Sequence, residues 1–307
     1  MNNILANKIL GVSIDKITVI GYISDVAKFQ HQIVSNLNIC KNYNSKYSKY
    51  RLMGFDSSIQ LANPFLGAID IKSTENIIRY EYNPNTIKDE GLEEYNKIIL
   101  DNIKNREISR LDIAIDIYLP QLFSDYDINY SNPVSKRIYT DKADRIETKY
   151  FGDITSDTFY RVYDKAKESK KNKKSKEYAQ GVWRIEVQIN TKAKVEEFAT
   201  GKYLPFEELT ILPKSDVDRA ILEALDYTTF QKLAFEQVYK DISLYDKLSQ
   251  SEKRKYRAIK KDYEAQLNNK LDIKPVDLYK LCKKGILEVR KELQIFTNTN
   301  RCCERTF

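Results

Sequence analysis

The chain has 307 residues, of which 42% are hydrophobic and 31% are charged, a composition typical of a globular protein and not of a disordered one. Its formal net charge is +7, from 51 Lys and Arg against 44 Asp and Glu. A surplus of this size favours a polyanionic partner only modestly, and ordinary surface charge explains it equally well.

Several kinds of chemistry lack their motifs in this sequence. His31 is the single histidine, so His-x-His and zincin metal sites are excluded, and a Ser-His-Asp triad would need His31 itself. No Walker A or G-x-G-x-x-G motif occurs. The four cysteines form no C-x-x-C pair, which favours a reducing compartment over a disulfide framework. Because no apolar run is long enough to span a membrane and no signal-peptide pattern is present, we expect a cytoplasmic protein without a membrane partner.

The first two thirds of the chain predict strands with helices between them. The β-branched segment Ser13–Ile23 predicts a strand, and Asp25–Leu37 has the apolar spacing of an amphipathic helix. A second helix is predicted over Leu92–Asn105. Further strands are predicted over Tyr50–Leu61, Gly67–Lys72, Ile77–Tyr82, Ser109–Tyr118, Arg137–Thr140, Lys149–Phe151, Thr158–Lys165 and Gly181–Asn190.

The pattern changes after Pro205. From Asp216 to Phe296 helix formers predominate, with Leu, Ile and Tyr at helical spacing. We therefore predict two domains, one over residues 1–205 and a helical one over residues 206–307.

Several predicted strands carry acids, arginines or tyrosine on one face only, since side chains alternate across a strand. A sheet with helices on one side and water on the other gives the same alternation. It explains less well why Asp, Glu and Arg occupy positions where Thr, Lys or Ser are usual. The polar faces carry Arg79 and Glu81, Arg110, Asp112 and Asp116, Arg161 and Tyr163, and Arg184 and Glu186.

These polar faces suit phosphate chemistry. Carboxylates on neighbouring strands repel one another unless a cation or an arginine offsets them, and their oxygens suit Mg²⁺ or Mn²⁺. Such an ion would polarise a phosphate, which Tyr163 could attack with the help of Arg161 and Lys165. A half-exposed strand tyrosine without a catalytic role is the alternative, since Tyr163 is one of 22 tyrosines.

A lysine-rich segment follows directly. Residues 165–176 (KAKESKKNKKSK) hold seven lysines and one glutamate. Such a segment would neutralise phosphates and make DNA binding steeply salt-dependent, although a solvated hairpin loop would have the same composition.

Three segments of the chain resemble the replication initiation factor family, namely SRLDIAIDIY (109–118), YFGDITSDTFYRVYDKAKE (150–168) and WRIEVQI (183–189). SIDKITV (13–19) and IRYEYNP (within 77–84) are similar to the early strands of that family. The specific part is the pair RVYDKAKE and WRIE at short spacing. Members of the family are rolling-circle initiators of Gram-positive plasmids, related conjugative-element nickases and replication proteins of filamentous phages.

The resemblance implies a nicking and closing enzyme that cuts one strand at an origin, keeps the 5′ phosphate on tyrosine and leaves a 3′-OH for polymerase. It implies Tyr163 as the nucleophile, with Arg161 and Lys165 beside it, and Mg²⁺ or Mn²⁺ as the cofactor. The implied metal ligands are Asp112, Asp116, Glu186 and Glu81. The resemblance implies Arg184, with Arg161 and Lys165, as phosphate contacts, and the lysine-rich segment contributes Lys167, Lys170, Lys171, Lys173 and Lys174 as further candidate DNA contacts.

The resemblance fades after residue 205, where a basic helix over Ser251–Asp262 is the second predicted DNA-binding element, with a solvated bundle face as its alternative. Its basic residues are Lys253, Arg254, Lys255, Arg257, Lys260 and Lys261.

The expected fold is α+β: an antiparallel or mixed sheet with helices on one face and an open catalytic face, followed by a helical C-terminal domain. The expected partner is origin DNA, double- or single-stranded. Host helicase and polymerase are further candidates, and a homodimer is left open. Two alternatives to an initiator remain: a non-catalytic DNA-binding regulator, and a conjugative relaxase with the same chemistry.

Overall fold

The structure is a computed structural model, and it describes residues 8–35, 42–46, 53–62, 67–89, 91–131, 135–171, 177–213, 218–240, 242–270 and 276–303. The strands of the main sheet are β1 (Ile9–Tyr22), β2 (Asn42–Lys46), β3 (Ser57–Ala62), β4 (Gly67–Lys72), β5 (Ile77–Tyr82), β6 (Lys104–Tyr118), β8 (Lys136–Thr140), β9 (Ile146–Phe151), β10 (Thr158–Asp164) and β11 (Val182–Ile189). A smaller sheet contains β7 (Tyr126–Tyr130), β12 (Leu209–Pro213) and β13 (Val276–Asp277). The helices are α2 (Val26–Ser35), α3 (Pro84–Asp89), α4 (Glu93–Asp101), α5 (Lys165–Lys171), α6 (Lys192–Thr200), α7 (Arg219–Ala224), α8 (Thr229–Lys240), the 3₁₀ helix η2 (Ile242–Lys247), α9 (Gln250–Lys270) and α10 (Leu278–Cys303).

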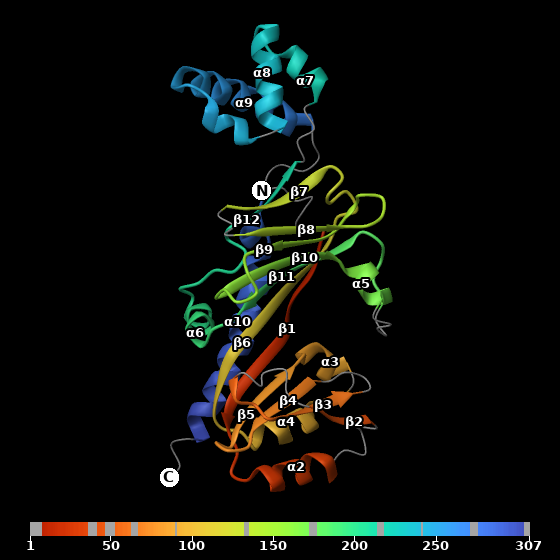
Figure 1. Cartoon of the computed structure of the whole chain (residues 1–307), viewed down its shortest axis with the longest axis vertical. Coiled ribbons are helices and arrows are strands. Elements are labelled where there is room, and N and C mark those ends of the chain that lie inside the picture. The colour runs from red at the N-terminus through yellow and green to blue at the C-terminus, as the bar shows by residue number, and fades with distance from the viewer. Residues whose placement is uncertain are drawn as a thin grey trace.

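A ten-stranded antiparallel sheet organises the chain, in the order β2-β3-β4-β5-β1-β6-β11-β10-β9-β8. Its two central strands are the longest, with 14 residues in β1 and 15 in β6. β5 pairs with the second half of β1, over Ile17–Tyr22, whereas β11 pairs with the second half of β6, over Leu111–Tyr118. The sheet is therefore two groups of strands joined through β1 and β6, one above the other in Figure 1.

One face of this sheet is apolar and packs against helices. Ile113, Ile115, Ile185 and Val187 are fully buried in the main hydrophobic core, together with residues of α3, α4, α6 and α10. Figure 1 shows α10 running along the back of the sheet. The approach is close at Gly285, where an added Cβ would lie 2.6 Å from the Cγ2 atom of Val12. The predicted α+β class with an antiparallel sheet is confirmed.

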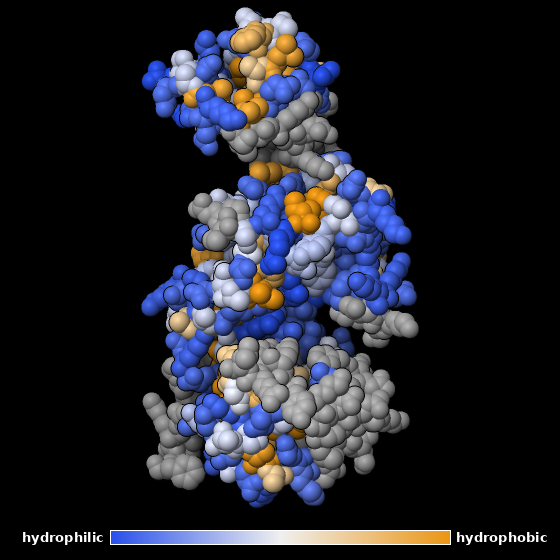
Figure 2. Space-filling model, viewed as in Figure 1, coloured by the Kyte–Doolittle hydropathy of each residue, from blue (hydrophilic) through white to orange (hydrophobic). Residues whose placement is uncertain are grey.

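A second hydrophobic cluster holds α7, α8 and α9 together, with Phe235, Tyr256 and Tyr263 at its centre. Figure 1 places this helical module at one end of the molecule, and Figure 2 shows hydrophobic residues gathered on its outer part. Within residues 206–307, however, β12 pairs with β7 and α10 joins the main core. The helical module is therefore inserted in the chain between β12 and α10, both of which pack with the sheet domain. The apolar stripe of α10 packs on β1 and not on α9.

The predicted secondary structure agrees with the structure in most segments that it covered. The strand predicted to end at Lys165 ends at Asp164, and α5 occupies the first half of the segment that was predicted as a lysine-rich loop. The strand predicted from Tyr50 begins at Ser57, and residues 50–52 lie outside the described ones. α6 was not predicted, although Thr191 caps its start by accepting from the Lys194 N–H and Gly201 ends it at φ +82°.

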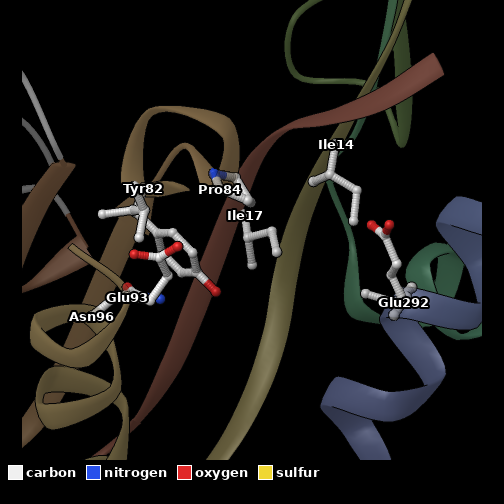
Figure 3. Close-up of a pocket in the computed structure, with 9 residues that line it drawn as sticks. Ile14, Ile17, Tyr82, Pro84, Glu93, Asn96 and Glu292 are labelled. Atoms are coloured by element: carbon white, nitrogen blue, oxygen red, sulfur yellow. The ribbon is translucent and has the colours of Figure 1, made fainter. Parts of the chain in front are cut away.

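A hollow opens on the helix-covered side of the sheet, between α4 and α10. Figure 3 shows Glu292 of α10 on one side of Ile14, and Tyr82, Glu93 and Asn96 grouped on the other. Among the described residues, none of the helices combines the length and the hydrophobicity that crossing a membrane requires.

Candidate active site

The polar sides of β5, β1, β6, β11 and β10 form one face of the sheet, opposite the helices. These five strands are neighbours in the sheet, and their register aligns the predicted site residues. Arg161 lies opposite Glu186 and Tyr163 opposite Arg184, while Arg184 in turn lies opposite Asp116. In these pairs the sheet therefore brings together residues as many as 68 positions apart in the chain. Figure 2 shows that the middle of the visible surface is predominantly hydrophilic.

Each predicted acid on this face is paired with a basic side chain. Asp112 accepts two hydrogen bonds from Arg110, at 2.8 and 2.7 Å, and Asp116 accepts two from Arg184, at 2.7 and 2.8 Å. Such two-point guanidinium–carboxylate pairs fix orientation as well as charge. Acidic and basic side chains are thus paired along and across neighbouring strands of this polar face.

Asp15 belongs to this face and was not predicted as a site residue. The register of β1 shifts between Ile14 and Lys16, which makes Asp15 the extra residue of a β-bulge. Ile14 and Ile17 are both buried in the core, so Asp15 and Lys16 lie together on the polar side, where Asp15 accepts from Arg184. Two polar residues between two core isoleucines were the sequence signal for this bulge.

Tyr163 lies half-buried on this face, at the end of β10. Its hydroxyl donates to Oε2 of Glu186 at 3.3 Å, and the cationic groups of Arg161 and Lys165 lie 5.9 and 5.6 Å from its ring centroid. Burial raises the pKa of Tyr163 well above its usual value, and the charge of Glu186 raises it further against the opposing effect of Arg184. The phenol is therefore neutral here and needs a base to become a nucleophile.

Glu186 is fully buried at the centre of the face. Burial raises its pKa, and the nearby charges of Asp15 and Asp112 add to that rise although Arg161 opposes it. One carboxylate oxygen accepts from Arg161 and the other from Tyr163. A carboxylate with a raised pKa in contact with a phenol has the properties of a general base. The family resemblance implied Glu186 as a metal ligand, and the structure adds this hydrogen bond from Tyr163.

The donor chemistry of the face suits a hard divalent cation, since carboxylate oxygens are the ligands that Mg²⁺ and Mn²⁺ prefer. Both oxygens of each predicted ligand already accept from basic or hydroxyl groups, and those of Glu81 do so from Lys16 and Arg79. Within the described part of the chain, no group of three Asp, Glu, Cys or His side chains is placed to hold a metal ion. A cation would therefore have to share the carboxylates with the arginines or replace them.

The lysines predicted near Tyr163 have diverse surroundings. Lys165 is buried, and its Nζ donates to Glu168 at 2.8 Å. Lys167 donates to Glu147 at 2.8 Å, whereas Lys170 and Lys171 are exposed in the last turn of α5. Lys173 and Lys174 lie outside the described residues.

The predicted basic helix is part of α9. Its apolar side, with Tyr256, Ile259 and Tyr263, is buried in the helical module, so its basic side faces outward. Arg254, Lys255, Arg257 and Lys261 are exposed, and Lys253 and Lys260 are half-exposed.

Comparison with known proteins gives one consistent result. No family model matches the chain. A replication initiation protein of Staphylococcus aureus is 29% identical over 221 residues, which cover 71% of this chain and 62% of that protein. Another from the same species is 34% identical over 112 residues, covering 36% of this chain and 35% of that protein. The chain thus matches less than two thirds of the length of these curated relatives.

Among solved structures, a rolling circle replication initiator protein from Geobacillus stearothermophilus matches with 17% identity and a TM-score of 0.42, covering 74% of this chain and 95% of that one. The similarity to the staphylococcal proteins confirms that the chain resembles the replication initiation protein family, as its motifs indicated.

Proposed function

We propose that this chain initiates rolling-circle DNA replication by cutting one strand of origin DNA with Tyr163. The observation that carries the proposal is the hydrogen bond from the Tyr163 hydroxyl to Glu186, on a face where Arg161 and Arg184 flank the phenol. This combines a nucleophile, a base and two guanidinium groups, which is what phosphoryl transfer from DNA requires.

In the proposed reaction the Tyr163 oxygen attacks the phosphorus of the scissile phosphodiester while its proton passes to Glu186. The bond between phosphorus and the 3′ oxygen breaks, and the departing oxygen takes a proton from solvent to leave a 3′-OH. The 5′ phosphate remains on Tyr163 as a phosphotyrosine ester. Attack by a 3′-OH on this ester reverses the step and closes the strand.

Arg161 and Arg184 have a second role in this proposal. Their guanidinium groups pair with Glu186 and Asp116, and phosphate oxygens would compete for them when DNA binds. The carboxylates of Asp116 and Glu186 released in this way, with Asp112 and Glu81 as further ligands, would hold Mg²⁺ or Mn²⁺, which would supply positive charge beside the phosphate. The exposed lysines of α5 and the basic side of α9 are the proposed contacts to the flanking DNA.

The test is the covalent intermediate. Supercoiled DNA that carries an inverted repeat from beside the gene is incubated with the protein, and a complex that survives denaturing electrophoresis is digested and mapped. We expect the DNA on the peptide that contains Tyr163, and no adduct or nick with Tyr163→Phe, whose ring and packing are unchanged.

Tyr160→Phe is the matched control. Tyr160 lies three positions away on the opposite face, buried in the core, with its hydroxyl bonded to that of Tyr203 at 2.9 Å, so this variant should still cut. An adduct that maps to Tyr178 or Tyr150 would overturn the assignment of the nucleophile. If the wild type binds the DNA and forms no adduct at all, the chain is a non-catalytic DNA-binding protein.

A further inference from the structure

A row of aromatic rings crosses β8, β9 and β10 outside the site described above. The ring of Tyr139 meets that of Tyr150 edge to face, with centroids 5.4 Å apart and planes at 76°. Tyr150 in turn stacks on Phe159, at 5.4 Å and 29°. The guanidinium of Arg137 lies 5.8 Å from the Tyr150 ring centroid. Aromatic rings with an adjacent arginine are therefore continuous across three strands.

This row lies on the same face of the sheet as Tyr163. Lys149 and Phe151 are buried on the apolar side, so Tyr150 between them points to the polar side. The register runs from Tyr139 through Thr148 to Tyr163. Two strand spacings separate Tyr139 from Tyr163, roughly 10 Å. Tyr139 is thus in line with the proposed nucleophile across Thr148, and Tyr150 lies directly opposite Arg161, two positions before that nucleophile.

The rings at the outer end of this row are exposed. Every residue of β8 is exposed, and Tyr139 is 51% exposed, because β8 is the outermost strand of the sheet. Protection of a sheet edge explains charged residues such as Arg137, but it does not explain an exposed tyrosine beside them. The neighbouring acids Asp141 and Glu147 are paired with Arg145 and Lys167, which reduces their repulsion of a polyanion.

We propose that Arg137, Tyr139 and Tyr150 form a stacking platform for unpaired bases of single-stranded DNA beside the phosphate that is cut. Bases of any sequence stack on aromatic side chains, and arginine adds a cation–π contact and a phosphate contact. The bases of an intact duplex are already stacked on one another, so the platform selects a strand that has been unpaired. This inference rests on the proposed function, since it uses Tyr163 as the point of cleavage.

The experiment measures binding and not cleavage. The probe is an oligothymidylate of about 16 nucleotides with 2-aminopurine placed at successive positions, and the protein is the full chain with Tyr163→Phe. Tyr139→Ala should weaken binding roughly 5- to 150-fold, the range that corresponds to the removal of one base–aromatic stack, and should abolish the quenching of 2-aminopurine at one position. Tyr139→Phe keeps the ring and should bind like the parent protein.

Two controls separate stacking from other effects. Tyr22 is 50% exposed at the far end of β1, and Tyr22→Ala should leave binding unchanged. A duplex of the same length should bind Tyr139→Ala and the parent protein equally. Equal binding and equal quenching of the single strand by the parent, Tyr139→Ala and Tyr150→Ala would overturn the proposal.

The outcomes for this inference and for the proposed function are distinguishable. If single-strand binding depends on Tyr139 but the wild type forms no adduct on origin DNA, the platform stands and the nicking activity fails. If the adduct forms at Tyr163 while single-strand binding is unchanged by replacing Tyr139 or Tyr150, the nicking activity is supported and the stacking platform is refuted.

Discussion

Replacing Glu81 with glutamine tests how strongly the ion pairs of the polar face stabilise the fold. The Glu81 carboxylate accepts from Lys16 at 3.0 Å and from Arg79 at 2.8 Å, and its side chain is 6% exposed. Burial by itself would raise the pKa of Glu81, but Lys16 and Arg79 outweigh burial and lower that pKa from 4.5 to about 2.

The lowered pKa fixes the sign and the pH range of the effect. A carboxyl group with a lower pKa in the folded state than in the unfolded state stabilises the fold above the unfolded value, and the stabilisation is lost as the pH falls through the folded value. The difference between 4.5 and about 2 corresponds to roughly 3 kcal/mol at pH 7 and roughly 1.5 kcal/mol at pH 3. Glu81→Gln should therefore lower the free energy of unfolding by about 3 kcal/mol at pH 7, and by about half as much at pH 3.

The assay is urea denaturation at both pH values, followed by the fluorescence of Trp183. This is the single tryptophan of the chain and it lies on β11 of the main sheet, so it reports on the sheet and not on the helical module. Glu75→Gln is the control: Glu75 is 50% exposed and pairs with Lys72, and its loss should cost less than about 1 kcal/mol.

An equal penalty for Glu81→Gln at pH 7 and pH 3 would refute the ion-pair reasoning, because a contribution from ionisation must shrink as the carboxylate is protonated. Stabilisation by Mg²⁺ in the wild type but not in Glu81→Gln would instead assign this residue to a metal site.

Three further predictions concern the proposed reaction. Chelation with EDTA should abolish nicking, and Mg²⁺ or Mn²⁺ should restore it; full activity in the chelator would remove the metal from the proposal. Glu186→Gln should slow nicking by roughly 10²- to 10⁴-fold while DNA binding persists. Because burial and the charges of Asp15 and Asp112 raise the pKa of Glu186, the rate of nicking by the wild type should increase as the pH rises through that pKa. A nicking rate that does not fall at low pH would argue against Glu186 as the base. Neutralising three or four lysines of Lys167–Lys176 should reduce the log–log salt slope of DNA binding by roughly one for each phosphate that the lysines no longer neutralise. An unchanged slope would mark the segment as a solvated surface.

The sequence by itself determined which face of each central strand is polar. In β6 and β11 the apolar residues alternate with Arg, Asp and Glu, and the structure buries the former against helices and places the latter together on the other face. The prediction of the polar face is correct because the alternation of side chains is a local property of an extended backbone. No tertiary contact changes this alternation without introducing a bulge.

Helix periodicity was also sufficient to predict helical structure where α9 and α10 lie, but not the surfaces on which these helices pack. Both have an apolar stripe at helical spacing, yet α9 packs within the helical module while α10 packs on β1, where Gly285 permits the close approach. An apolar stripe predicts that one side of a helix is buried, but it does not predict which surface the helix packs on.

Only the tertiary structure decided how the polar residues are combined. The pairs Arg161–Glu186 and Arg184–Asp116 depend on strand order and register, and Asp15 reaches Arg184 through a bulge whose pairing partner lies about 100 positions away in the chain. The same holds for Glu186, which the family resemblance placed among the metal ligands and which the register of β10 and β11 places in contact with Tyr163. Pairing across strands is set by hydrogen-bond register between distant segments, and the residues of a single strand do not encode it.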